Sequence, residues 1–342
     1  MKLSSLILKK ELNKLRKVAG GNIPALNCVL FECFGDKAKL TSGDGEVYLT
    51  TEIELIEGGD DKFLVDCKTL ADAIKTLPPQ PIELVIDDKL VCNYNKGSFV
   101  IPIYDSEQYP SVGEVEGGTI HVNDVSRVVL SKSFFADDQL RPVMSGVFFD
   151  FENGFIVSTD GHKLYRGEFI EGEGSFICPP KCLQAISSFD SFDVTFNDTN
   201  AMFVNGNTRV YSRLIEGNYP NYNSVIPRNN HIACEVNRVD LIEALRRMEV
   251  MSSASSGMVR MSFKDNELTL KVEDLDLMTG GSETLDCSCS SSIEIGFKIP
   301  FLIQILNSIS GDIAYAKLSE PSRASLWNGD NEDVFLLMPM MI

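Results

Sequence analysis

The feature that most constrains the fold of this chain is a pattern that occurs three times along it. An aspartate closes a strand-like run in each third, at Asp44, Asp160 and Asp274. The spacings of 116 and 114 residues agree with one third of the 342-residue length. A fixed internal period of this kind predicts that one structural unit is built three times.

Each predicted unit contains two helices. In the first third, Leu8, Leu12 and Leu15 recur at i, i+4 and i+7, the spacing of one helix face. The same spacing recurs at residues 241–248, and a weaker pattern covers residues 123–135. A shorter helix is expected after each repeated aspartate, at residues 66–77, 180–189 and 300–309.

Between the helices, the sequence has β-rich runs bounded by glycine, asparagine and aspartate turns, a pattern typical of strands. Strands are expected at residues 47–56, 82–86, 99–104, 147–151, 194–196, 259–263 and 268–272. The predicted fold class is therefore α+β, with three similar domains that each combine β-sheet with two helices. Two Tyr-Pro pairs, ending at Pro110 and Pro220, place the domains at residues 1–112, 113–228 and 229–342.

The charge of the chain is strongly acidic but uneven. The sequence has 31 Lys and Arg against 49 Asp and Glu, a formal net charge of −18. Such a charge argues against a protein that binds phosphates tightly. Residues 9–17, however, hold five basic side chains and one acidic side chain, a local charge of +4. This segment is either an ordinary solvated helix face or a surface that faces an anionic partner.

Composition also indicates the environment of the protein. No run is long and apolar enough to span a membrane, and the first ten residues do not have the pattern of a signal peptide. The nine cysteines are scattered, and the close pairs 178/182 and 287/289 do not have zinc-site spacing. We therefore expect a cytoplasmic protein with reduced thiols, no metal, no cofactor and no membrane partner.

Four segments together resemble the bacterial β sliding clamp family. They are residues 140–149 (LRPVMSGVFF), 158–164 (STDGHKL), 216–227 (EGNYPNYNSVIP) and 337–342 (LMPMMI). The resemblance extends over the whole chain, with the domains in the family's number and order. It implies the DNA-clamp fold and a nucleoid-associated processivity factor that is not an enzyme.

The resemblance further implies a head-to-tail homodimer whose six domains form a ring around double-stranded DNA, without sequence preference. Twelve inner helices spaced ~9 Å apart would leave a hole roughly 24 Å wide once a ~10 Å helix diameter is subtracted. This hole would pass B-form DNA without gripping it, which fits the acidic net charge. The residues that would face DNA are Lys9, Lys10, Lys14, Lys17, Arg127, Lys132, Arg246 and Arg247.

The resemblance also implies a hydrophobic pocket for short peptides of the clamp loader, the replicative DNA polymerase, other polymerases and repair proteins. Its residues would be Met144, Thr159, Gly161, His162, Lys163, Leu164, Pro227, Leu336, Leu337, Met338, Pro339 and Met340. Without the resemblance, the sequence of residues 159–164 favours an ordinary hairpin turn. Lys163 stands where arginine is common in the family, which keeps the charge and loses bidentate geometry.

The implied dimer interface pairs Phe99 and Ile101 of the first domain with Val250 and Met251 of the third, unless all four are ordinary core residues. Two other functions stay open from the residues alone. A hydrolase could use His162, although the sequence has neither a nucleophile elbow nor a phosphate-binding glycine loop. A multidomain scaffold could bind peptides without encircling DNA.

Overall fold

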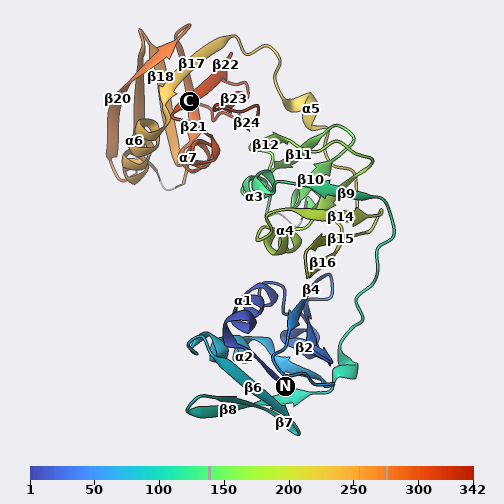
Figure 1. The fold of residues 1–342 in the computed structure, drawn as a ribbon. Helices are drawn as coiled ribbons and strands as arrows, with labels where there is room; N and C mark the ends of the chain where they lie inside the picture. The colour runs from blue at the N-terminus through green and yellow to red at the C-terminus, as the bar shows by residue number, and fades with distance from the viewer. Residues whose placement is uncertain (138–139, 254, 275) are drawn as a thin grey trace. The chain divides into compact units, whose positions relative to one another are not determined.

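The computed structural model describes residues 1–137, 140–253, 255–274 and 276–342. Apart from short helical turns, the described elements have the same order in each third: a strand, a helix, four strands, a helix and three strands (Figure 1). The first third contains β1 (Lys2–Ser4), α1 (Ser5–Leu15), β2 (Cys28–Phe34), β3 (Lys37–Gly43), β4 (Val47–Glu54), β5 (Lys62–Asp66), α2 (Cys67–Lys75), β6 (Pro81–Ile86), β7 (Lys89–Tyr94) and β8 (Gly97–Tyr104).

The other two thirds repeat this order. The middle third contains β9 (Thr119–Val122), α3 (Ser126–Ser131), β10 (Val147–Asp150), β11 (Phe155–Thr159), β12 (Lys163–Glu168), β13 (Ser175–Cys178), α4 (Pro180–Ile186), β14 (Phe192–Phe196), β15 (Asn200–Asn205) and β16 (Thr208–Arg213). After the single turn of α5 (Tyr222–Val225), the last third contains β17 (Ile232–Asn237), α6 (Arg238–Met251), β18 (Met258–Lys264), β19 (Glu267–Asp274), β20 (Thr279–Cys289), β21 (Ile293–Lys298), α7 (Ile299–Ser308), β22 (Ile313–Leu318), β23 (Ser325–Asn328) and β24 (Val334–Leu337). The predicted α+β class and threefold repeat are confirmed.

The helices form where the apolar spacing predicts them. Leu8, Leu12 and Leu15 are all buried on one face of α1, and α1 packs against α2 as α6 packs against α7 (Figure 1). Asp66 begins α2, because its carboxylate accepts the backbone N–H of Thr69 at 2.7 Å. None of the described helices is long and apolar enough to cross a membrane.

Most of the 24 described strands lie outside the seven expected runs, and two of the differences from the prediction have a clear physical cause. Helix α3 is only six residues long against the expected 123–135, because its buried side is limited to Val128 and Ser131. The eleven-residue strand β20 was not predicted, since its sequence TGGSETLDCSC is mostly polar. Its backbone pairs with β19 over eight residue pairs, so main-chain hydrogen bonding rather than apolar alternation defines this strand.

The described strands form two twelve-stranded antiparallel sheets, to which each third contributes two four-stranded segments, called sheets below, with the same internal order. The orders are β1-β6-β7-β8 with β5-β2-β3-β4, then β9-β14-β15-β16 with β13-β10-β11-β12, then β17-β22-β23-β24 with β21-β18-β19-β20. Sheets of successive thirds join where β4 pairs with β16 and where β12 pairs with β24. These two pairings are called here the first and the second junction.

The described contacts divide the chain into two compact units, Met1–Val125 with Cys178–Glu216, and Ser126–Ile177 with Gly217–Ile342. Each unit has its own apolar core, for example the stacked rings of Phe31 and Phe63 in the first and the buried Trp327 in the second. The middle third contributes one of its two sheets to each unit. The division at residues 1–112, 113–228 and 229–342 therefore stays a prediction.

Candidate functional site

The hairpin turn between β11 and β12 is organised by Asp160. One carboxylate oxygen accepts the backbone N–H groups of His162 at 2.8 Å and of Lys163 at 2.9 Å. Gly161 adopts φ +88°, which a residue without Cβ adopts at little cost. The second carboxylate oxygen of Asp160 lies 3.3 Å from Nζ of Lys163, so the aspartate binds the turn that follows it through both oxygens.

The same turn is built in all three repeats. Asp44 and Asp274 also accept two backbone N–H groups each, from residues two and three positions further along, at 2.7–3.0 Å. The periodic aspartates therefore have a structural cause: each one replaces a backbone acceptor in a tight turn.

Beside the turn of the middle repeat lies a cavity of about 250 Å³ at the second junction. Seven of the twelve predicted pocket residues line it: Met144, Thr159, Gly161, Lys163, Leu164, Leu336 and Met338. Methionine and aliphatic walls of this kind accommodate varied apolar side chains. The lining suits a partner that inserts a leucine-sized or aromatic side chain.

The other five predicted residues lie around the cavity rather than on its lining. The ring of His162 stacks on Phe301 with centroids 6.1 Å apart. Leu337 is fully buried within β24, and the backbone N–H of Met340 donates to the carbonyl of Gly296 at 2.8 Å. Pro227 and Pro339 are half-buried.

Four lining residues were missed by the sequence reasoning: Pro220, Asn221, Tyr222 and Val225. The Tyr-Pro pair in this segment was interpreted as a domain boundary and as part of the family resemblance, and was not assigned to the pocket. Tyr222 is fixed in place because its hydroxyl donates to the buried carboxylate of Asp150 at 2.7 Å. The available signal for a role in the pocket was the group of aromatic and apolar residues in the linker at residues 219–226.

Lys163 is a buried cation with a structural role rather than an exposed one. Its side chain is only 6% exposed, and Nζ donates to the carbonyl of Ser133 at 2.6 Å. The ammonium lies over the rings of Phe134 and Phe301, at 5.0 and 5.5 Å from their centroids. Burial lowers the pKa of Lys163, and the carboxylate of Asp160 partly opposes that effect. The lysine thereby fixes the turn to the segment after α3 and packs against Phe301 of α7.

The first and second junctions differ in the side chains at one register position. In the second, Leu164 of β12 pairs with Leu336 of β24. At the same register in the first, Tyr48 pairs with Tyr211. The ring of Tyr48 lies 6.2 Å from that of Tyr211 and 6.4 Å from that of Tyr109. Three aromatic rings therefore occupy the position that two leucines leave partly open.

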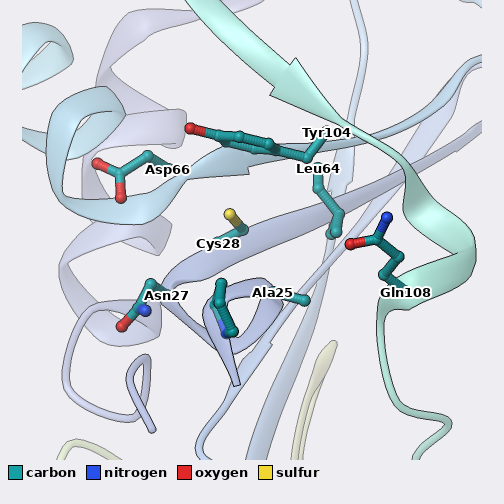
Figure 2. A pocket seen from close by; sticks show the side chains of 8 residues that line it. Ala25, Asn27, Cys28, Leu64, Asp66, Tyr104 and Gln108 are labelled. Carbon is teal, nitrogen blue, oxygen red and sulfur yellow. The ribbon is translucent and has the colours of Figure 1, made fainter. Parts of the chain in front are cut away.

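A second cavity of about 240 Å³ lies in the first third (Figure 2). It was not predicted, and its lining is more polar: Pro24, Ala25, Asn27, Cys28, Leu64, Asp66, Tyr104 and Gln108. Burial, together with the carboxylate of Asp66, raises the pKa of the Cys28 thiol to about 11. The thiol therefore stays protonated near neutral pH and is a poor nucleophile.

The predicted DNA-facing residues occupy different environments. Ion pairs at 2.6–2.9 Å within the described ranges join Lys14 to Glu11, Arg127 to Asp333 and Arg247 to Glu283. Lys10, Lys17 and Arg246 are exposed, while Lys9 and Lys132 are half-buried. Arg127 is the least suited to face DNA, since its guanidinium is bound to a carboxylate that is 1% exposed.

The predicted interface residues differ in exposure. Ile101 is buried in the sheet, and Phe99 on the same strand β8 is half-buried. Val250 and Met251, at the end of α6, are 76% and 41% exposed. Their part in a dimer therefore stays a prediction, with the α6 pair the better placed to meet a partner.

Comparison with known proteins identifies the family. The family model of the DNA polymerase III beta subunit N-terminal domain matches residues 7–113, and that of the C-terminal domain matches residues 223–341. The Beta sliding clamp of Haemophilus influenzae is 25% identical over 94% of this chain and 93% of its own length. The Beta sliding clamp of Treponema pallidum is 27% identical over 97% and 96% of the two chains.

Solved structures show the same fold. The DNA polymerase III subunit beta from Pseudomonas aeruginosa has a TM-score of 0.93 at 21% identity over the full length of both chains. A sliding clamp from Bartonella birtlesii, bound to griselimycin, has the same TM-score, identity and coverage. Because both domain models of one subunit match in order and relatives align over nearly their whole length, the chain belongs to the bacterial β sliding clamp family, the beta subunit of DNA polymerase III.

Proposed function

We propose that this chain is a sliding clamp: a ring-shaped homodimer that encircles duplex DNA and tethers the replicative polymerase to it. The single observation that carries the proposal is the repeated junction. Strands β4 and β12 hold the same position in their thirds, and each pairs with the last strand of the next third, β16 or β24. In the last third, the strand that corresponds to β4 and β12 is β20. In the first third, the strand that corresponds to β16 and β24 is β8.

Strands β8 and β20 each have one edge that pairs with no other strand along most of its length within the described residues. Among the described residues, β8 pairs along residues 97–102 with β7 alone, and only its last two residues reach β5. Strand β20 pairs along residues 279–286 with β19 alone. Pairing β20 of one subunit with β8 of a second would repeat the internal junction. Used twice, this heterologous contact closes a dimer and covers two exposed sheet edges.

The cavity at the second junction supports a peptide-binding role. We infer that short apolar segments of the clamp loader, polymerases and repair proteins bind there, with the chain itself performing no catalysis. Met338 extends the cavity wall, because its backbone N–H donates to the carbonyl of His162 at 2.8 Å and holds the tail against the turn. The tail after Leu337 thereby becomes part of the site.

Retention on DNA of defined topology tests the ring. The full-length protein should elute at about 76 kDa, twice the 37.9 kDa chain, and once loaded should stay on a closed circle of DNA. Linearising the circle should release it, because a ring without tight phosphate contacts slides off an end. Retention that does not depend on DNA topology would overturn the ring mechanism, and a stable monomer would favour the scaffold alternative.

Two truncations test the pocket separately. Removal of residues 338–342 deletes a cavity wall, so polymerase stimulation should be lost while the dimer persists. Removal of residues 341–342 alone is the matched control, since Met341 is 89% exposed and neither residue lines the cavity. Equal stimulation by the longer truncation and the wild type would refute the pocket assignment without affecting the ring.

A further inference from the structure

Three thiols gather in the last third, where its two sheets meet. Strand β17 is the edge of one four-stranded sheet and β20 is the edge of the other. The last residues of β20 leave β19 and pair with β17, with Cys289 opposite Cys234 and Cys287 opposite Val236. In the first third, the corresponding contact between β1 and the chain after β4 is a bridge between Lys2 and Glu57, whose side chains form an ion pair at 2.7 Å.

The geometry of the Cys234–Cys289 pair is compatible with a disulfide bond between the two side chains. The two Sγ atoms are 2.7 Å apart, against ~2.05 Å in a disulfide bond. Residues directly opposite on antiparallel strands have Cα atoms about 4.5–5.5 Å apart, within the roughly 4.4–6.8 Å that a disulfide spans. The backbone therefore needs little movement for the bond to close.

Access differs between the two members of this pair, and Cys287 beside them is partly exposed as well. Cys234 is 2% exposed, whereas Cys289 is partly exposed and can meet a small oxidant. Burial, with the neighbouring Cys289 thiol, raises the pKa of Cys234. Cys289 is therefore the thiol that reacts first. Cys178 and Cys182 also interact, but both are fully buried.

We propose that Cys234 and Cys289 are an oxidation site at which a low-molecular-weight disulfide such as oxidised glutathione forms a cross-strand disulfide. The Cys289 thiolate attacks one sulfur of the oxidant, forms a mixed disulfide and releases one glutathione thiolate. The Cys234 thiolate then attacks the Cys289 sulfur and releases the second. The two protons lost by the cysteines go to the two glutathione thiolates, and the protein loses two electrons.

The disulfide covalently links β17 to β20, and so links the two sheets of the last third. It closes a loop of roughly 55 residues, which restricts the unfolded chain. For a unit of this size, we expect the melting temperature of the oxidised protein to rise by about 10 °C. Residues 279–286 of β20, whose second edge is proposed to pair with β8 of another subunit, precede the disulfide in the strand. Oxidation therefore stabilises the domain without occupying that edge.

Thiol trapping on the full-length protein tests the site. The reduced protein is incubated with oxidised glutathione, unreacted thiols are alkylated, and the peptides are mapped by mass spectrometry. The expected product is a cross-linked peptide pair containing Cys234 and Cys289, two hydrogens lighter than the reduced pair, with Cys287 alkylated. A stable glutathione adduct on Cys289 without the cross-link, or a cross-link through Cys287, would overturn the proposal.

Matched variants on one strand complete the test. Cys287→Ser should keep both the cross-link and the rise in melting temperature, because Cys287 faces Val236 across the sheet. Cys289→Ser should lose both. Equal melting shifts on oxidation of the two variants would contradict the assignment, and the wild-type peptide map decides the question even where a variant folds poorly.

Discussion

The contact between Arg127 and Asp333 joins segments 206 residues apart and gives the sharpest prediction. Nε of Arg127 donates to a carboxylate oxygen of Asp333 at 2.9 Å. Asp333 is 1% exposed, while the arginine side chain is 30% exposed. Arg127→Ala would leave a buried carboxylate without its cation.

The magnitude follows from this asymmetry of burial. Breaking a buried ion pair costs about 3–5 kcal/mol, and partial solvation of the arginine places this contact near the lower end, about 3 kcal/mol. For a unit of this size, such a loss lowers the melting temperature by roughly 6–12 °C. The double variant Arg127→Ala/Asp333→Ala should recover about 1–3 kcal/mol, because no unpaired charge remains.

Denaturant unfolding of the two single variants and the double variant measures the coupling. Arg246→Ala serves as a control, since this exposed cation should change stability by less than about 0.5 kcal/mol. If Arg127→Ala unfolds like the wild type and instead weakens retention on circular DNA, the ion-pair reasoning is refuted and Arg127 faces DNA after all.

Two further predictions concern the turn beside the pocket. Gly161→Ala should lower the free energy of unfolding by about 1 kcal/mol, since φ is +88° and a Cβ would lie 3.2 Å from Arg141 Nη1. The control Gly206→Ala, at φ +54° in open space, should cost about as much in unfolding experiments. Only the Gly161 variant should weaken peptide binding measured by calorimetry. Lys163→Met should flatten the pH dependence of stability: the folded state lowers the pKa of Lys163 below 10.5, so the unfolded chain binds more protons and the wild type gains stability as pH rises towards 10.5. Parallel stability–pH curves for wild type and Lys163→Met would count against this burial effect.

The local elements could be predicted because their causes are local. Leucines at helical spacing mark α1, and the aspartates at 44, 160 and 274 mark turns that each depend on one carboxylate and two nearby N–H groups. Strand β20 was missed because its pairing is a backbone property that its polar side chains do not signal. The short α3 was overestimated because a weak apolar stripe does not reveal where burial ends.

The candidate site could be predicted only in part, for reasons of distance along the chain. Leu164 and Leu336 were included through the family resemblance. They pair across the second junction although they are 172 positions apart in the sequence, and no local pattern records that pairing. Arg127 was interpreted as exposed because nothing near it in sequence indicates Asp333. Tyr222 was missed because a linker residue acquires its role only when β10 presents Asp150 to its hydroxyl.

The tyrosines at the first junction have a consequence for valency. Since Tyr48 and Tyr211 occupy the register that Leu164 and Leu336 hold at the second, one chain offers one apolar pocket of this design among its described junctions. The proposed dimer would then present two such pockets, on opposite subunits of one ring. A partner with two binding segments and a linker long enough to reach both would gain avidity from effective concentration alone, and two single-segment partners could share one ring.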